Sequence, residues 1–183
     1  MKLTKFILLT GIIAFTWSCS SVRVVADYDR QANFKEYTSF AFYKPGIDKA
    51  EVSDLDKKRI LRAIEAEMVA KGFTKSEDPD ILISILTKEK ERINMNNAGW
   101  NPYWGPGFNN NVSTRTEGIL YIDFIDAERK DLVWQGKGSG TVTENMDRKE
   151  ERINKFVREI LAIYPPGSKA NRVREEESYP PYN

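Results

Sequence analysis

The chain has 183 residues, nearly equal numbers of basic and acidic side chains (28 and 27), one cysteine and no histidine. The balanced charge gives no electrostatic reason to expect a nucleic-acid partner, and the missing histidine excludes Ser-His-Asp and Cys-His catalysis. Because histidine and cysteine are also the commonest ligands of zinc, copper and iron, we expect no metal site and no cofactor.

The N-terminus has the layout of an export signal. Lys2 and Lys5 give a positive start, and the apolar stretch Phe6–Trp17 follows. That stretch is too short to span a bilayer, which takes about 20 apolar residues. It has the length of a signal-peptide core, so we predict that residues 1–18 are a signal peptide.

The single cysteine, Cys19, comes directly after this signal. Thr16-Trp17-Ser18 is a poor match to the A-x-A cleavage site of a soluble secreted protein. With Cys19 it resembles a lipobox instead, which implies lipidation by diacylglycerol and palmitate and a tether to a membrane. Because Ser20 and Ser21 follow rather than aspartate, we expect an outer-membrane lipoprotein facing the periplasm. The alternative is an ordinary signal beside a stray cysteine.

Two strands are predicted early in the mature chain, at residues 22–28 and 39–43. Both runs are rich in β-branched or aromatic residues, which favour strands. A helix should follow from Ser53 to about Lys71, because Ser53 with Asp56 resembles a capping box. Gly72 ends this helix as its left-handed residue, and its buried stripe comprises Ile60, Leu61, Ile64 and Met68.

The second half predicts three strands. Residues 81–86 are apolar on both faces, which is typical of an inner strand. The charged run 88–92 is expected to project past the sheet edge. Residues 118–126 alternate apolar and polar side chains, and Leu132-Val133-Trp134 returns as the hairpin partner.

A second helix follows from about Asp147, where Asp147 and Glu150 form an N-terminal cap pattern. Pro165-Pro166 ends it. Its continuous apolar stripe comprises Ile153, Phe156, Val157, Ile160, Leu161 and Tyr164. The charged, proline-bearing tail 167–183 is expected to be disordered.

These elements predict one α+β domain over residues 19–166. Strands and helices do not alternate strictly, which favours a two-layer sandwich over a doubly wound sheet. We expect two helices packed on one face of a mostly antiparallel sheet of about five strands. The crossover through the first helix can make one strand pair parallel.

Six blocks, taken together in order and spacing, resemble a known family: 27–29, 34–42, 71–73, 79–83, 117–126 and 132–136. The family is the bacterial lipoprotein domain known as domain of unknown function 4136, and the resemblance spans roughly residues 22–166. It implies an envelope lipoprotein with an α/β domain. It supplies no catalytic residues.

The insert 94–112 is the most unusual segment, because asparagine, glycine and proline forbid a regular element while four aromatic residues interrupt them: Trp100, Tyr103, Trp104 and Phe108. Exposed aromatic side chains on a loop can stack on sugars, bind a partner or sit at a bilayer interface. The alternative is that they pack onto their own domain. We name them as candidate contacts to a ligand or partner.

Two further patterns have a structural and a functional interpretation. Gly136, Gly138 and Gly140 alternate along a predicted strand, but no helix follows closely enough for a phosphate-binding loop. They are expected to allow close packing or a bend. Four acidic residues could form a paired-carboxylate or calcium site, or could cap turns: Asp27, Asp29, Asp123 and Asp126.

The sequence therefore predicts a non-catalytic, lipid-anchored envelope protein that binds or assembles with a protein or glycan partner in the periplasm. One alternative is a histidine-free hydrolase that uses carboxylates on cell-wall glycan. Another is a calcium-dependent or glycan-binding module that acts through the aromatic insert. A cleft with converging acids would favour the hydrolase, and an aromatic platform would favour the module.

Overall fold

The computed structural model describes residues 22–95, 112–141 and 145–167. Its sheet has six strands in the order β1-β6-β5-β4-β2-β3. Their bounds are β1 Arg23–Tyr28, β2 Ser39–Phe42, β3 Thr74–Lys75, β4 Ile81–Met95, β5 Val112–Asp126 and β6 Leu132–Thr141. The helices are α2 Lys44–Ile47, α3 Asp54–Ala70 and α4 Met146–Leu161.

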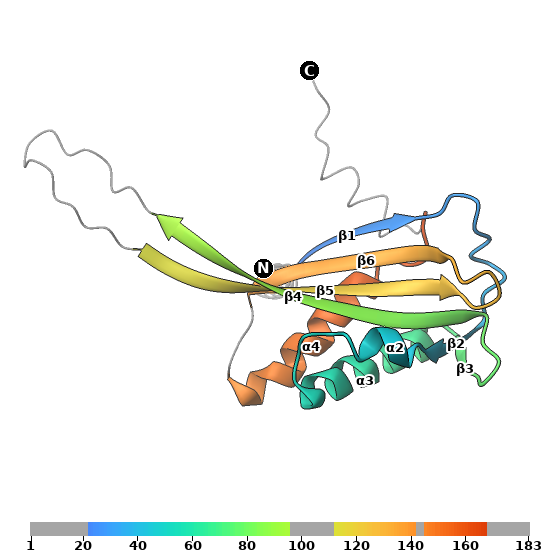
Figure 1. Cartoon of the computed structure of the whole chain (residues 1–183), viewed down its shortest axis with the longest axis horizontal. Coiled ribbons are helices and arrows are strands. Elements are labelled where there is room, and N and C mark those ends of the chain that lie inside the picture. The colour runs from blue at the N-terminus through green and yellow to red at the C-terminus, as the bar shows by residue number, and fades with distance from the viewer. Residues whose placement is uncertain (1–21, 96–111, 142–144, 168–183) are drawn as a thin grey trace, which may run out of the picture.

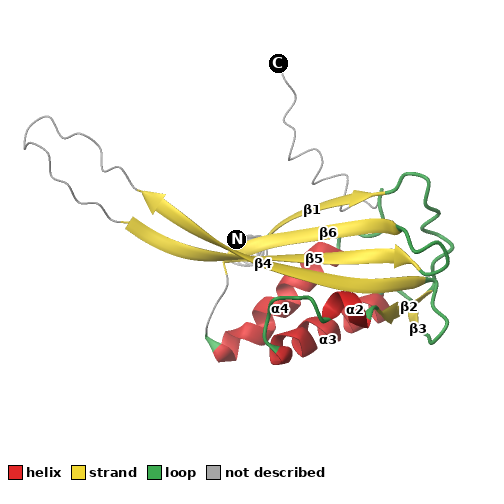
Figure 2. Cartoon of the chain, in the orientation of Figure 1, coloured by secondary structure: helices red, strands yellow, loops and turns green. Residues whose placement is uncertain are grey.

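The predicted α+β class is confirmed. β1, β6, β5 and β4 pair antiparallel, and β2 pairs parallel with β4 and β3, so the sheet is mixed but mostly antiparallel. α3 and α4 lie side by side on one face of it (Figures 1 and 2). The sheet has one strand more than expected, because the two-residue β3 is too short to leave an alternating pattern in the sequence.

The ends of α3 are those that the sequence predicts. The Ser53 hydroxyl accepts a hydrogen bond from the Asp56 amide at 3.2 Å, which satisfies one of the first-turn donors. Gly72 has φ +89°, and the Phe73 amide donates to the Met68 carbonyl at 3.0 Å. This is the hydrogen-bond pattern of a glycine-ended helix. Of the predicted stripe, Ile60, Ile64 and Met68 are buried and Leu61 is half-buried.

The start of α4 corrects the sequence analysis. The helix begins at Met146, and the side-chain oxygen of Asn145 accepts a hydrogen bond from the Arg148 amide at 3.3 Å. Asn145 therefore caps the helix in place of the predicted Asp147, since asparagine accepts at this position as well as aspartate does. The predicted stripe is buried apart from the half-buried Ile153. The helix ends at Leu161, however, so Tyr164 of that stripe lies beyond it.

The long hairpin of β4 and β5 is a second correction. Register pairs run without a break from Ile81 and Asp126 to Met95 and Val112. The charged run 88–92 is therefore a paired part of β4. The predicted insert 94–112 also begins and ends in strands, because residues 94 and 95 belong to β4 and residue 112 belongs to β5. Charged residues are tolerated here because Lys88, Glu89 and Lys90 are exposed. The outer part of the hairpin extends past the helices (Figure 1).

The core lies between the helices and the sheet. Its largest fully buried side chains include Trp134, Phe40 and Phe124, and the Tyr164 ring lies 4.8 Å from that of Phe124 and 5.3 Å from that of Trp134. Residues 22–164 thus contain all the buried apolar side chains that the structure describes. Within the described ranges, no helix has the length and apolar content needed to cross a bilayer.

Two of the alternating glycines bring α4 close to the sheet. A Cβ at Gly136 would lie 2.3 Å from the Trp134 ring and 2.5 Å from the Cγ2 of Ile160. A Cβ at Gly138 would lie 2.8 Å from the Ile160 side chain. The bare backbone therefore leaves room for Ile160, as the close-packing interpretation predicts.

Candidate functional site

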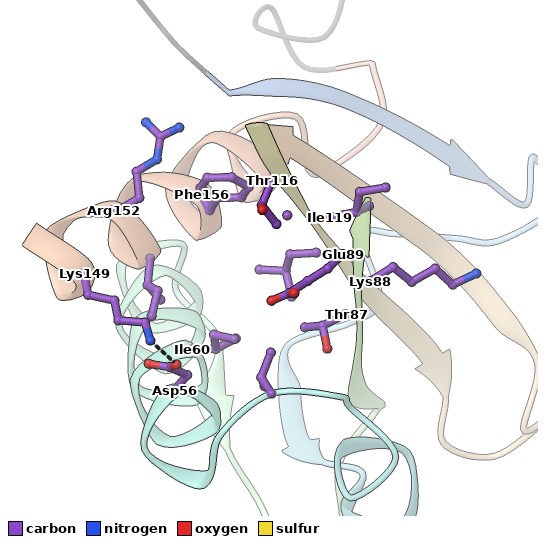
Figure 3. A pocket seen from close by; sticks show the side chains of 14 residues that line it. Asp56, Ile60, Thr87, Lys88, Glu89, Thr116, Ile119, Lys149, Arg152 and Phe156 are labelled. Carbon is purple, nitrogen blue, oxygen red and sulfur yellow. Dashed lines mark ion pairs between the residues drawn. The ribbon is translucent and has the colours of Figure 1, made fainter. Parts of the chain in front are cut away.

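A pocket opens beneath the N-terminal halves of α3 and α4, where the β4–β5 hairpin passes beyond the helices (Figure 3). Its volume is about 360 Å³, within the range that small-molecule sites occupy. Its floor is apolar and includes Ile60, Leu120, Ile153 and Phe156. Both helices and both strands contribute to it, so the sandwich itself fixes its shape.

Polar side chains surround this floor. Asp56 and Lys149 come from the two helices, Arg152 lies one turn further along α4, and Thr87 and Glu89 come from β4 (Figure 3). Carboxylate, ammonium, guanidinium and hydroxyl groups therefore border one apolar surface. Such a combination fits an amphiphilic ligand, which places its apolar part on the floor and its polar part at the rim.

Asp56 and Lys149 join the two helices at one side of the pocket. The Lys149 ammonium lies 2.7 Å from one carboxylate oxygen of Asp56, and the Arg59 guanidinium lies 2.7 Å from the other. Burial disfavours the charged carboxylate, but hydrogen bonds with Lys149, Ser53 and Arg59 outweigh it and hold the pKa of Asp56 below its ordinary value. Asp56 is thus a charged, fully partnered group that positions the wall.

Arg152, one turn along α4 from Lys149, is held in place by two contacts. Its guanidinium donates to the Thr141 carbonyl, at 2.9 Å from Nη2, and lies 5.2 Å from the centre of the Phe156 ring. These contacts keep a cation beside the apolar floor.

The hydroxyl of Thr87 is a polar group of the pocket wall. Only 7% of the residue is exposed, and among the residues that the structure describes its Oγ1 has no hydrogen-bond partner. A buried hydroxyl without a partner costs about 1–3 kcal/mol, and such groups are rare in folded proteins. Thr87 thus places a buried hydroxyl without a described partner in the pocket wall.

Two of the four candidate aspartates cap turns. Asp29 accepts a hydrogen bond from the Gln31 amide at 2.8 Å. Asp126 accepts from the amides of Glu128 and Arg129 at 3.0 and 2.8 Å. These are the roles that the structural interpretation predicts for aspartate at turns.

The other two aspartates share one row of the sheet. Asp27 and Asp123 both lie opposite Gln135, on neighbouring strands. The Gln135 amide donates to Asp123 at 2.8 Å, and burial raises the pKa of the Asp123 carboxyl. Neither residue lines the pocket. Within the described ranges, no group of three or more histidine, cysteine, aspartate or glutamate residues could hold a metal ion.

The family model described as "Domain of unknown function (DUF4136)" matches residues 24–166. The chain belongs to the DUF4136 family. This confirms the resemblance seen in the sequence blocks. No match is found among curated proteins.

Solved structures show distant similarity to this DUF4136 domain, and one of them shares its fold. A PDZ domain protein from Parabacteroides distasonis ATCC 8503 has 14% identity and a TM-score of 0.52, over 89% of this chain and 41% of that chain. The chain therefore spans about two fifths of the length of that protein. Two structures of the PelC dodecamer from Paraburkholderia phytofirmans have 11% identity and TM-scores of 0.42 and 0.43, over 77% of this chain and 95% of theirs.

In the described part of the chain, none of the candidate site residues named from the sequence lines the pocket of the DUF4136 domain. Cys19 and the four aromatic residues of the insert lie outside the described residues. The pocket residues were not predicted, although one signal was available. Thr87 continues the inward-facing alternation of Ile83 and Ile85, so a polar side chain stands at a core position of β4.

Proposed function

We propose that this DUF4136 domain is a non-catalytic binding module of the cell envelope, tethered by lipid on Cys19 to the outer membrane and facing the periplasm. Its ligand is an amphiphilic small molecule or the amphiphilic part of an envelope partner, bound in the pocket between α3, α4 and the β4–β5 hairpin. The observation that carries the binding role is the buried, unpartnered hydroxyl of Thr87 in the pocket wall.

The chemistry of the pocket supports binding rather than turnover. Its acids are Asp56, which is paired with cations, and Glu89, which is exposed at the rim. An amphiphile with an acidic head would place its apolar chain on Ile153 and Phe156. The head would then lie near the cations Lys149 and Arg152, with a hydrogen bond to Thr87.

Thr87→Val should raise stability and weaken ligand binding. Valine keeps the shape but removes the unpartnered hydroxyl, so we expect the free energy of unfolding to rise by about 1 kcal/mol. Calorimetric titration with dodecanoate, a probe with an apolar chain and an acidic head, should show affinity reduced roughly 5- to 10-fold. Stability is measured by urea unfolding.

Thr38→Val is the matched control, because the Thr38 hydroxyl already donates to Asp80 at 3.0 Å. That variant should lose stability and keep the dodecanoate affinity. Unchanged affinity in Thr87→Val would contradict the assigned contact. If dodecanoate fails to bind and a cell-wall disaccharide binds, the ligand is a glycan and the amphiphile is wrong.

The tether makes a separate prediction. Cells grown with radioactive palmitate should label the protein, and Cys19→Ala should abolish both the label and recovery in the membrane fraction, because two or more acyl chains are needed for stable anchoring. Label that persists in Cys19→Ala, or a mature N-terminus elsewhere than Cys19, would overturn the anchor while leaving the pocket proposal standing.

A carboxylate hydrolase is the second candidate, and the raised pKa of Asp123 is the observation that favours it. A carboxyl whose pKa is raised keeps its proton to a higher pH than an ordinary carboxyl does, as a general acid must. Cell-wall glycan cleavage that is lost in Asp123→Asn, with stability unchanged, would support this function over binding.

A further inference from the structure

The sheet has a second face that the helices do not cover. α3 and α4 both pack on one side (Figure 1). Thr87, Lys88 and Glu89 all contribute to the pocket lining. Because side chains alternate along a strand, the Lys88 side chain points away from the pocket toward the other face (Figure 3). In the register of the strands, the side chains beside Lys88 on this open face come from β5, β6 and β1.

Two neighbouring rows of this open face contain cations and no acids, and the rows on either side of them contain Asp27, Asp123 and Glu117. One row runs Leu86, Tyr121, Lys137, Val25, and the next runs Lys88, Ile119, Ser139, Arg23. The ammonium groups of Lys88 and Lys137 lie 6.0 and 5.8 Å from the centre of the Tyr121 ring. We call Arg23, Lys88, Tyr121 and Lys137 the basic aromatic patch.

Apolar side chains accompany the patch. Val25 is 60% exposed, and Ile119 is half-buried. Cations with aliphatic stems, a tyrosine ring and exposed apolar groups on a gently twisted sheet match the interface of an anionic bilayer, where phosphate and glycerol lie above the acyl chains. A face formed by paired strands is an extended surface, which fits a bilayer better than it fits a small ligand.

The patch also lies close to the proposed tether. Arg23 is the fourth residue after Cys19, so an extended chain places it no more than about 14 Å from the lipidated residue. Two anchoring signals act together when they are near one another, because the first holds the second at high local concentration.

We propose that the basic aromatic patch docks on the anionic phospholipid headgroups of the membrane to which Cys19 is tethered. The orientation of the domain on the membrane rests on the proposed lipid anchor at Cys19. The contact with headgroups depends on the folded domain alone. Docking through this face leaves the pocket, on the opposite side of the sheet, turned toward the aqueous compartment.

One other basic surface could compete for the membrane. A groove along α3 contains Lys58, Arg59, Arg62 and Lys75. Arg59 pairs with Asp56 at 2.7 Å, and Lys75 pairs with Glu65 at 3.0 Å, so acids already balance two of these cations. This groove lies on the helical side, and the domain cannot place both surfaces on one bilayer.

The test uses the unlipidated chain from Ser20 to Asn183, which contains every helix and strand that the structure describes. Sedimentation should show binding to vesicles of phosphatidylglycerol and phosphatidylcholine, no binding to pure phosphatidylcholine, and loss of binding at high salt. Each cation near an anionic surface contributes about fivefold in affinity. K88Q/K137Q should therefore bind about 25-fold more weakly, while the matched variant K58Q/R62Q should stay within about twofold of wild type.

Cooperative thermal unfolding of all variants excludes a folding defect as the cause of weaker vesicle binding. Equal binding to both kinds of vesicle, or a larger loss in K58Q/R62Q than in K88Q/K137Q, overturns the proposal. A chain that binds anionic vesicles only after residues 168–183 are removed also overturns the proposal. That result would mean that the patch pairs with the acidic segment Glu175–Glu177 rather than with headgroups. Palmitate labelling of Cys19 is measured separately, so failure of the anchor and failure of the patch are distinguished.

Discussion

Gly136→Ala should lower the free energy of unfolding by about 3 kcal/mol, the upper part of the range for overpacked cores. The added Cβ would stand 2.3 Å from the Trp134 ring and 2.5 Å from Ile160 Cγ2, distances at which something must move. Trp134 and Ile160 are both fully buried, so neither can turn into solvent. Urea unfolding measures the loss, and thermal unfolding should show a decrease in Tm of roughly 10 °C.

Gly138→Ala provides the matched comparison. Its Cβ would meet the Ile160 side chain at 2.8 Å, and one of the two contacting atoms is the flexible Cδ1. We expect a smaller loss, about 1–2 kcal/mol. Ile160→Val, which removes that Cδ1, should recover part of it in a double-mutant cycle. Equal losses in the two alanine variants, or no recovery, would show that α4 does not set the requirement for glycine.

The glycine alternation was visible in the sequence, and so was most of the fold, because each depends on local periodicity. The stripe of α4 repeats at helical spacing over about three turns. Ser53 and Gly72 mark the ends of α3 by chemistry that acts within a few residues. These signals do not depend on which residues lie across the core.

The features that the sequence failed to predict depend on partners distant in the chain. The charged run 88–92 is a strand because 115–119 lies opposite it, and no local pattern favours a strand there. The pocket needs Asp56, Thr87 and Lys149 from three separate elements. A single sequence does not show that these residues meet. Thr87 alone carried a local signal, as a polar residue in phase with buried isoleucines.

Asp126 connects two segments that lie far apart in the sequence. One carboxylate oxygen accepts from the amides of Glu128 and Arg129 within the β5–β6 turn. The other accepts from the Tyr37 hydroxyl at 2.8 Å and from the Arg129 side chain at 3.2 Å. Only 8% of Asp126 is exposed. The residue thus holds the turn to the loop that precedes β2, a structural role in which its carboxylate is fully engaged.

Asp126→Ala should lower the free energy of unfolding by about 3 kcal/mol at neutral pH, because it leaves several donors without their charged acceptor. Asp29→Ala, which removes a single exposed turn contact, should cost no more than about 1 kcal/mol. Burial alone would raise the pKa of Asp126, but hydrogen bonds from the Arg129 amide, the Tyr37 hydroxyl and the Arg129 side chain hold it below the ordinary 3.8.

A depressed pKa in the folded state fixes the sign of the pH dependence. The stability that Asp126 contributes is complete at pH values above 3.8, its value in the unfolded chain, and is lost as the pH falls through the lower folded value. The difference in stability between wild type and Asp126→Ala should therefore be constant from neutral pH to about pH 5 and shrink below pH 4. Urea unfolding across this range measures it. A difference that persists unchanged in acid would mean that the carboxylate's charge is not what holds the turn. Loss of an enzymatic activity at unchanged stability would instead return Asp126 to the hydrolase hypothesis.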